Sequence, residues 1–244
     1  MLAKRRSWRN ILKIIIIIPA TLLLNIDCFL SSSGSVDIPV EEYFAGFFVG
    51  RVTEGDITTI VFAMENLAFV LLFIILFGNS ISEKTGFVPA YYFTRERNRG
   101  KWFARECAKL SGMAAIYVLL YCAVLFIISC ILTGAHINHR FILEVLFFFA
   151  VSAALIVMMT VLANILTLKL GTAPAFICVC VIVLGLCILA ISCQKPILNF
   201  INPMCYVQSQ NTNIWLRTGN VIYDYALAAL ICTAGSVYMS RKDI

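Results

Sequence analysis

The chain has few of the side chains from which enzymes and metal sites are built. Its 244 residues include two histidines, His136 and His139, and charged residues make up 13% of the total. Both histidines fall in one short expected turn, so they cannot form a metal or haem site inside a membrane, and a surface metal would lack most of its ligands. A solvated turn is the favoured interpretation, and we expect neither a metal nor a catalytic residue in this chain.

A nucleotide-binding loop of the form Gly-x4-Gly-Lys-Ser/Thr is also missing. Gly100 and Lys101 are followed by Trp102, where such a loop needs a hydroxyl residue. Arg95 stands where the loop needs its first glycine. The chain is therefore not expected to hydrolyse ATP alone.

The ten cysteines have no metal or redox spacing. Cys178 and Cys180 are separated by one residue, so they form no Cys-x-x-Cys and point to different faces of a helix. Most of the others lie in or against apolar runs, where cysteine behaves as a small hydrophobic residue. Cys193 and Cys205 share one expected outer loop, and a disulfide between them stays open as an alternative if that compartment is oxidising.

Apolar residues are what the sequence has in excess. They make up 61% of the chain, and the mean hydropathy is +0.92. A single soluble core cannot hide so much apolar surface, so lipid must be the solvent for much of it. The segments between the apolar runs are too short for a separate soluble domain. Residues 1–244 are therefore expected to form one transmembrane domain.

Six apolar segments are suited to crossing a bilayer as helices, for which about 20 residues are needed. They cover residues 14–30, 57–80, 110–133, 141–168, 173–192 and 221–240. Residues 2–13 precede them with Arg5, Arg9 and Lys13 at intervals of four, which is typical of a helix at the membrane interface. We predict an all-α membrane protein, a bundle of six transmembrane helices with an N-terminal interfacial helix.

Lysines and arginines are unevenly divided between the two sides of these spans. Fifteen of the 19 fall on the side of the termini, and only Arg51, Arg140, Lys195 and Arg217 fall on the other. Cytoplasmic loops retain cations during insertion, so both termini are predicted to be cytoplasmic in a multi-pass protein of the plasma membrane. Because the cations flank spans, anionic lipid accounts for the net charge of +6, and nucleic acid is not an expected partner.

Two longer segments are predicted on the outer side. Residues 31–56 are acidic and partly aromatic, which favours a short lid resting on the membrane surface. In residues 193–223, Pro196 and Pro203 accompany two short apolar pieces at 197–201 and 214–216. Neither piece approaches the length of a span, so re-entrant outer half-helices are predicted before the last span.

The second span carries an adjacent polar pair, Glu65 and Asn66, one turn before Phe69. Polar groups inside a membrane are costly, so the pair should face protein or water. These three residues are candidates for a translocation path. A structural hydrogen bond from Glu65 to a neighbouring helix is the favoured alternative.

The longest inner loop, residues 81–109, joins the second and third spans. An amphipathic, aromatic piece comes first, and a basic turn follows it. Lys101, Arg105 and Lys109 then recur at four-residue spacing on one face of a helix, which leaves Trp102, Phe103 and Cys107 available to lie against lipid or protein. An ordinary positive-inside loop with an aromatic belt is the alternative interpretation.

This loop and the topology around it resemble the membrane subunits of ABC-2-type transporters, bacterial export permeases whose ATPase is a separate polypeptide. The likeness covers nearly the whole chain in topology. Locally, the stretch from Glu83 to Lys109 is similar to the Arg-rich, Trp-containing loop of small permeases that export peptides or antimicrobials from Firmicutes. Because that family docks this loop in its ATPase, the resemblance implies a cytoplasmic coupling helix over about residues 84–93, followed by basic residues that meet the ATPase or anionic lipid. The implied coupling residues are Lys84, Phe87, Tyr91, Tyr92, Phe93, Arg95, Arg97, Arg99 and Trp102.

The function implied by the resemblance is that of a permease subunit in an ATP-driven exporter. Two copies of the ATPase would bind ATP and Mg²⁺, and this chain would hold no cofactor. Six helices without an evident polar stripe need a second permease copy, so a homodimer or a pair with a related permease is expected. Aromatic and aliphatic walls favour an amphipathic or hydrophobic cargo, a peptide first and a lipid or drug-like molecule next. A membrane immunity or assembly protein that binds a toxin or partner without moving it is the alternative.

Overall fold

The computed structural model describes Lys13, Ile16 and Pro19 together with residues 57–87, 98–133, 139–192, 202–203 and 214–241. Within these ranges the regular elements are helices and no strand occurs, so the expected all-α class is confirmed for this part of the chain. The helices are α4 (Ile57–Phe77), α5 (Ser82–Phe87), α7 (Arg99–Thr133), α8 (His139–Leu170), α9 (Thr172–Ser192) and α12 (Ile214–Arg241).

Five of the described helical segments are long and apolar enough to cross a membrane. They cover residues 67–84, 99–124, 145–170, 172–189 and 218–241. Their outward faces carry large aliphatic side chains such as Ile75, Ile177 and Leu230, which lipid can cover but water would not. The protein is therefore a multi-pass membrane protein. The expected span at 14–30, most of the interfacial helix and the outer lid at 31–56 lie outside the described residues, so a count of six spans stays a prediction.

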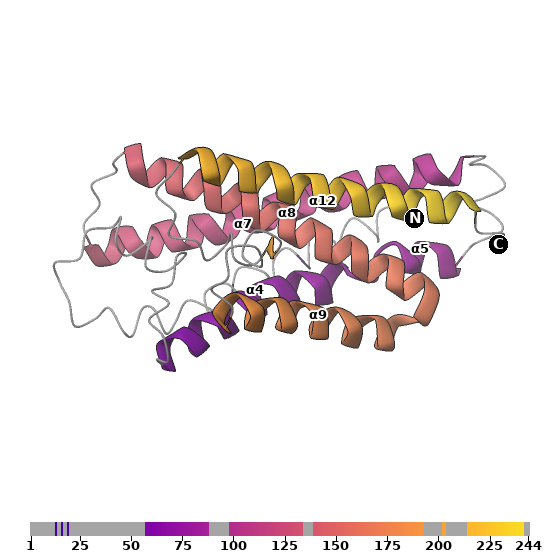
Figure 1. Cartoon of the computed structure of the whole chain (residues 1–244), viewed down its shortest axis with the longest axis horizontal. Helices are drawn as coiled ribbons and strands as arrows, with labels where there is room; N and C mark the ends of the chain where they lie inside the picture. Colours follow the sequence, from indigo (N-terminus) through magenta and orange to yellow (C-terminus); the bar gives the residue numbers. More distant parts are fainter. Residues whose placement is uncertain are drawn as a thin grey trace.

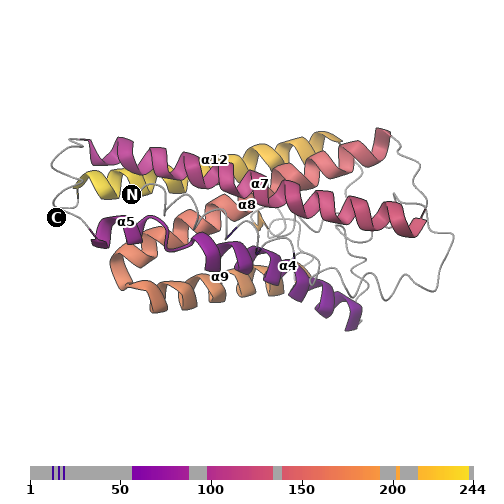
Figure 2. The same cartoon turned by 180° about the vertical axis from the view of Figure 1, so that it is seen from behind.

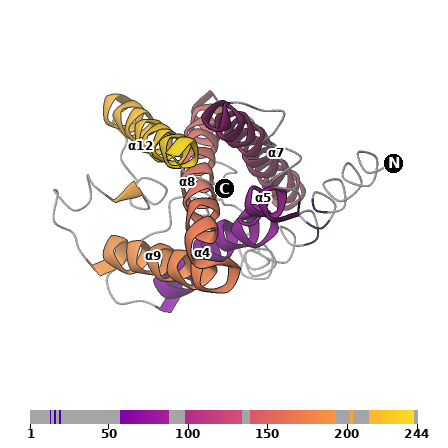
Figure 3. The ribbon, with the colours of Figure 1, turned by 90° about the vertical axis from the view of Figure 1, so that its right-hand side faces the viewer.

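α8 is the central helix of the bundle. Each residue from 151 to 161 is buried, and 67% of its span is enclosed by protein, against 22% for α9 and 17% for α12. A view along the bundle shows α8 in the middle, with α12 and α7 above it and α4 and α9 below (Figure 3). α9 is as apolar as α8 but faces outward over most of its surface, so it is packing between helices, and not apolar composition, that makes α8 the central helix.

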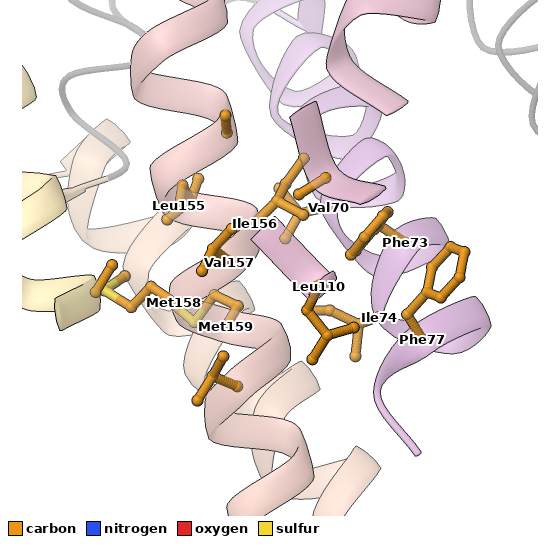
Figure 4. Packing of buried hydrophobic residues seen from close by; sticks show 14 of the residues in the cluster. Val70, Phe73, Ile74, Phe77, Leu110, Leu155, Ile156, Val157, Met158 and Met159 are labelled. Carbon is orange, nitrogen blue, oxygen red and sulfur yellow. The ribbon is translucent and has the colours of Figure 1, made fainter. Parts of the chain in front are cut away.

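The core lies where α4, α7 and α8 meet. Val70, Phe73, Ile74 and Phe77 of α4 pack towards Leu110 of α7 and the buried run 155–159 of α8 (Figure 4). Lipid tails are as apolar as these side chains, so close packing and dispersion, rather than escape from water, hold the helices together.

Gly171 makes the connection between α8 and α9. It has a φ of +86°, a left-handed conformation that glycine adopts without the steric cost of a side chain. Its N–H donates to the Thr167 carbonyl oxygen at 3.1 Å, which closes the end of α8. The connection is tighter than the predicted spans 141–168 and 173–192 suggest, since α8 continues to Leu170 and α9 begins at Thr172.

Two helices begin earlier than the spans predicted for them. α7 begins at Arg99, so the helical face expected from Lys101, Arg105 and Lys109 is continuous with the span predicted at 110–133. α12 begins at Ile214, so the apolar piece 214–216 is the first turn of the last helix and not a separate half-helix. In both cases a polar or basic stretch lowers the hydropathy at the start of the helix.

The rest of the predicted re-entrant segment is described at Asn202 and Pro203 only. The Asn202 amide donates to the Leu186 carbonyl oxygen at 2.8 Å, and Asn202 is buried. Leu186 lies inside α9, so Asn202 sits beside that helix and not beyond its end. The half-helix shape and the alternative disulfide between Cys193 and Cys205 lie outside the described residues.

One end of the bundle gathers most of the described cations. Opposite views place α5, the start of α7 and the ends of α8 and α12 together (Figures 1 and 2). We call this region the basic end, and its cations are Lys84, Arg99, Lys101, Arg105, Lys109, Lys169 and Arg241. The lysines and arginines that the sequence predicts on one side of the spans therefore lie mostly at one end of the bundle, within the described residues.

Candidate functional site

The candidate site begins at the break between α4 and α5. Residues 78–81 form a turn, in which the Gly78 N–H donates to the Ile74 carbonyl oxygen at 2.6 Å. A Cβ atom on Gly78 would lie 2.5 Å from that oxygen and 3.3 Å from the Cβ of Ala163. A side chain at this position would collide with the backbone of its own helix, so glycine allows α4 to turn while pressed against α8.

Asn164 of α8 holds this turn from inside the bundle. Its Oδ1 accepts the Ile81 N–H at 2.8 Å, and its Nδ2 donates to the Phe77 carbonyl oxygen at 3.2 Å and to the Thr160 carbonyl oxygen at 2.8 Å. The amide is fully buried. A helix break inside a membrane leaves backbone groups without partners, and this amide satisfies one donor and one acceptor of the break.

Glu106 then joins α5 to α7. Its carboxylate accepts hydrogen bonds from the ammonium groups of Lys84 on α5 and Lys109 on α7, the second at 2.8 Å. The Glu106 side chain is 7% exposed, whereas that of Lys84 is 22% and that of Lys109 is 60%. A buried carboxylate with two cationic partners is compensated, and removal of the better-buried partner would cost the most. Lys84 is therefore engaged inside the protein.

Asn98 starts α7. Its Oδ1 accepts the N–H of Lys101 at 3.0 Å, and its carbonyl oxygen accepts the N–H of Trp102 at 3.1 Å. This is the arrangement of an N-cap residue, whose side chain satisfies a free donor of the first turn. The cap explains why the helix begins at Arg99, ahead of the apolar stretch that the sequence analysis expected as the span.

The first turns of α7 pack closely against the last turns of α12. Ser236 donates a hydrogen bond to the Gly100 carbonyl oxygen at 3.1 Å. A Cβ on Gly100 would lie 2.9 Å from the Ser236 hydroxyl, and a Cβ on Gly235 would lie 2.5 Å from the Phe103 ring. Each glycine thus admits a group from the other helix. Trp102 is buried in the same region, so it supports the helix from within and presents no surface to a partner.

The opposite face of these turns is basic and exposed. Lys101, Arg105 and Lys109 are exposed, and the four-residue spacing expected from the sequence puts them in one stripe. α7 has 35 residues, which makes it about 52 Å long at about 1.5 Å per residue, more than the hydrocarbon core of about 30 Å. Its basic first turns therefore extend out of the hydrocarbon at the basic end. We call Lys101, Arg105 and Lys109 the basic stripe.

The candidates for a translocation path lie on α4, and Phe69 is the one whose side chain is described. Its ring stacks on Tyr117 at a centroid distance of 4.9 Å and lies 4.3 Å from the ring of Tyr121. The Tyr117 hydroxyl donates to the Phe69 carbonyl oxygen at 2.7 Å. Phe69 is buried where α4 meets α7, so these contacts account for its position without a path inside the bundle. Glu65 and Asn66 lie on the same helix, and their side chains lie outside the described set.

The structure covers part of the predicted coupling set. Lys84 lies in α5, Phe87 ends that helix and Arg99 begins α7. The remaining residues of the loop, Tyr91, Tyr92, Phe93, Arg95 and Arg97, lie outside the described residues. The structure brings Lys84 and the helix of Trp102 together through Glu106, but it does not place Trp102 on the surface.

Three polar residues that organise this part of the chain escaped the sequence analysis, the buried Glu106 and Asn164 and the exposed Asn98. Glu106 stands among cations, where its charge is easily overlooked, but its spacing of three residues from Lys109 is a helix-pair signal. Asn98 precedes a helix start, where asparagine is a preferred cap. Asn164 is an amide within a long apolar run, which by itself indicates a required hydrogen bond.

The described side chains of the site connect helices to one another. Among the described residues there is no group of three or more His, Cys, Asp or Glu that could hold a metal. Comparisons with family models, curated proteins and solved structures find no match to this chain. The main feature of the site is an exposed basic stripe on α7. This helix is bonded to α5 and α12 and continues into the membrane.

Proposed function

We propose that this chain is the membrane-spanning permease subunit of an ATP-driven ABC exporter in the bacterial plasma membrane. The observation that carries the proposal is the mechanical continuity of the basic end. α5 is bonded to the start of α7 through Lys84 and Glu106, and that start is one helix with a transmembrane segment. A partner that displaces α5 or the first turns of α7 therefore displaces a transmembrane helix directly.

The partner in this proposal is an ATPase on a separate chain, present in two copies, which binds ATP and Mg²⁺. The exposed basic stripe offers a positive surface to acidic residues of that partner. The basic end faces the cytoplasm, as the positive-inside rule requires, and so both termini are cytoplasmic. ATP binding draws the two ATPases together, and their differential affinity for two arrangements of the permease shifts the bundle between them.

A second copy of the permease completes the route in this proposal. The described interior is filled by packed side chains, with α8 enclosed and Phe69 within an aromatic cluster. A route between two copies, as a homodimer, needs no channel inside one bundle. Exposed aliphatic residues such as Ile177 on α9 and Ile222 on α12 would give it apolar walls, which suit an amphipathic or hydrophobic cargo such as a peptide.

The experiment is purification of the chain together with the ATPase expressed from the neighbouring gene, followed by measurement of peptide-stimulated ATP hydrolysis in nanodiscs. The double variant Lys101→Glu/Arg105→Glu reverses the charge of the stripe and leaves Lys109 bonded to Glu106. We expect this variant to retain at most a tenth of the bound ATPase. Arg241→Glu is the matched control, because Arg241 is an exposed cation of the same end on another helix.

Two outcomes would overturn the proposal. One is unchanged ATPase binding and stimulation in the double variant, and the other is a stable, active monomer that needs no ATPase. Tight binding of a peptide by the isolated chain, with no ATPase partner and no transport, would instead support the immunity or assembly function. Nanodiscs of neutral lipid remove anionic headgroups as an alternative ligand for the stripe.

A further inference from the structure

α12 carries a carboxyl group in a place where few proteins tolerate one. Asp224 is 1% exposed, and it shares the buried face of the helix with Asn220 and Ala228. Neither of its carboxyl oxygens has a hydrogen-bond partner among the residues that the structure describes. It lies within the apolar segment 218–241, which is long enough to cross a membrane. The other buried acid among the described side chains, Glu106, is compensated by two lysines.

The contacts between α12 and α7 give the surroundings of this carboxyl. Ser236 meets Gly100, Gly235 meets Phe103 and Cys232 lies beside Cys107, so the two helices pack antiparallel in one register. Continued for about two turns, at about 3.6 residues per turn, this register brings Asp224 level with Ala114 of α7. Ala114 is buried and apolar and offers no partner to a carboxylate.

α8, the other helix packed closely on α12, also supplies no charge at this level. Its described side chains from Val145 to Leu168 include no titratable group. The hydroxyl of Ser152 is buried and, like the carboxyl, has no partner within the described residues. The titratable groups on the middle of α7 are Tyr117, Tyr121 and Cys122, of which the two tyrosines contact Phe69 of α4. On α12 itself they are Tyr223 and Tyr225.

An ionised carboxylate without a partner is far more costly in this setting than a protonated one. We propose that Asp224 is an intramembrane proton-binding site, occupied while α12 is packed against α7 and α8. When α12 separates from them and water reaches the carboxyl, the O–H bond of the acid breaks and the proton passes to water. The ionised form then opposes repacking until a proton returns.

A proton is the ligand that this site fits. A metal ion would need several donors, and no group of three or more His, Cys, Asp or Glu occurs among the described residues. A cationic group of a cargo would need space, and the carboxyl is 1% exposed. α12 is the least enclosed of the five candidate spans, with 17% of its span buried, so most of its surface already faces outward.

The direction of the pH dependence follows from proton linkage. The packed arrangement binds one proton that the separated arrangement releases, so acid favours packing and alkali favours separation. One proton changes the ratio of packed to separated protein by at most tenfold per pH unit. This inference concerns the isolated chain and holds whether or not the chain works with an ATPase.

The first test measures proton occupancy in the wild-type chain in nanodiscs. Infrared spectroscopy detects the C=O stretch of a protonated carboxyl and needs no reagent to enter the packed bundle. We expect the wild-type chain at pH 6 to show such a band that Asp224→Asn lacks, and the band should decline as the pH rises to 9. Glu106, held ionised by Lys84 and Lys109, should contribute no such band. Identical bands in the wild type and Asp224→Asn at pH 6 would overturn the proposal.

The second test measures whether the proton controls packing. Cys107 is 4% exposed between α7 and α12, so N-ethylmaleimide reaches it only when the helices separate. Asp224→Asn has the shape of the protonated acid and cannot ionise. Since both proteins carry the same thiols, the ratio of their alkylation rates removes the effect of thiol ionisation. We expect the wild-type to Asp224→Asn ratio to rise with pH, by up to tenfold per unit. A ratio that stays constant from pH 6 to 9 would contradict the proposal.

Discussion

Asn164 accepts a hydrogen bond from the backbone N–H of Ile81 at 2.8 Å, across 83 positions of sequence. The same amide donates to the Phe77 carbonyl oxygen, so one side chain of the central helix α8 closes both sides of the break between α4 and α5. Because this break leads into α5 and the predicted coupling loop, the position of that loop depends on a residue deep inside the bundle.

Replacement of Asn164 by leucine should destabilise the protein. The change leaves the Ile81 N–H buried without an acceptor and removes two donated bonds, and an unsatisfied buried group costs about 1–3 kcal/mol. Thermal unfolding in detergent should show a lowered Tm, and hydrogen exchange should speed up at residues 78–84. The control is Thr167→Val on the same helix, because the Thr167 hydroxyl bonds only to the Ala163 carbonyl of its own helix. Equal Tm values for the two variants would mean that the hydrogen bonds from Asn164 to Ile81 and Phe77 contribute no stability.

Lys84→Met should free α5 from α7. The substitution leaves the buried carboxylate of Glu106 with Lys109 as its remaining partner, and a hydrogen bond to a charged group is worth about 1.5–3 kcal/mol. Hydrogen exchange of residues 82–87 should accelerate about tenfold or more. Lys109→Met should have a smaller effect, because Lys109 is 60% exposed and exposed ion pairs contribute little. The idea fails if Lys109→Met loosens α5 more than Lys84→Met does.

Gly235→Ala should disrupt the packing of α12 on α7. The added methyl group would lie 2.5 Å from the Phe103 ring and 2.8 Å from Ile165 of α8, so aromatic and aliphatic side chains must move, at a cost of about 1–3 kcal/mol. Gly219→Ala, on the same helix, meets nothing within 4 Å and should be neutral or stabilising, because alanine favours a helix by about 1 kcal/mol over glycine. Tm values of the two variants in the same detergent give the comparison, and a Gly235→Ala protein as stable as the wild type would show that the interface is loose.

Phe69→Ala should lower the free energy of unfolding, and it should not act by changing a translocation path. Its ring contacts Tyr117 and Tyr121 within the core, and truncation of a buried phenylalanine costs about 3–5 kcal/mol. Tyr117→Phe removes one hydroxyl donor and should cost about 1 kcal/mol. The free energy of unfolding in lipid or mild detergent distinguishes these values. A stable Phe69→Ala protein with altered cargo export would support the path assignment instead.

Glu65→Gln tests whether Glu65, which lies one turn before Phe69 on α4, belongs to a translocation path. The amide keeps the shape of the carboxyl and its ability to form hydrogen bonds, so a structural role predicts export within about twofold of the wild type. A role in contacting a cationic cargo predicts a loss of about tenfold or more, because a charge-assisted bond is replaced by a neutral one. Export into vesicles measures this directly, and normal export would remove Glu65 from the path.

The apolar periodicity determined much of the fold. α4, α8 and α9 match their expected spans closely because a bilayer allows few alternatives to a helix of about 20 apolar residues. The stripe of Lys101, Arg105 and Lys109 was also predictable, since a spacing of four marks one face of a helix. The partner, the cargo and the number of spans stay predictions.

Hydropathy could not predict where α7 and α12 begin. A hydropathy profile ends a span where charges appear, but Asn98 caps α7 eleven residues earlier and the C-terminal turns of α12 pack against those residues. Trp102 illustrates the same limit. It follows Lys101 in a basic stretch, and the family resemblance implies that it contacts an ATPase, yet the amphipathic face of the helix buries it.

The sequence by itself determined that this chain is helical, crosses a membrane repeatedly and carries its cations mainly on one side, because these properties depend on local composition and on the cost of polar groups in lipid. Only the tertiary structure decided that Asn164 reaches the turn at Ile81, that Glu106 joins α5 to α7 and that Asp224 has no hydrogen-bond partner among the described residues. Such relationships depend on which helix faces meet, and distant segments acquire shared hydrogen bonds or lose them only when the bundle packs.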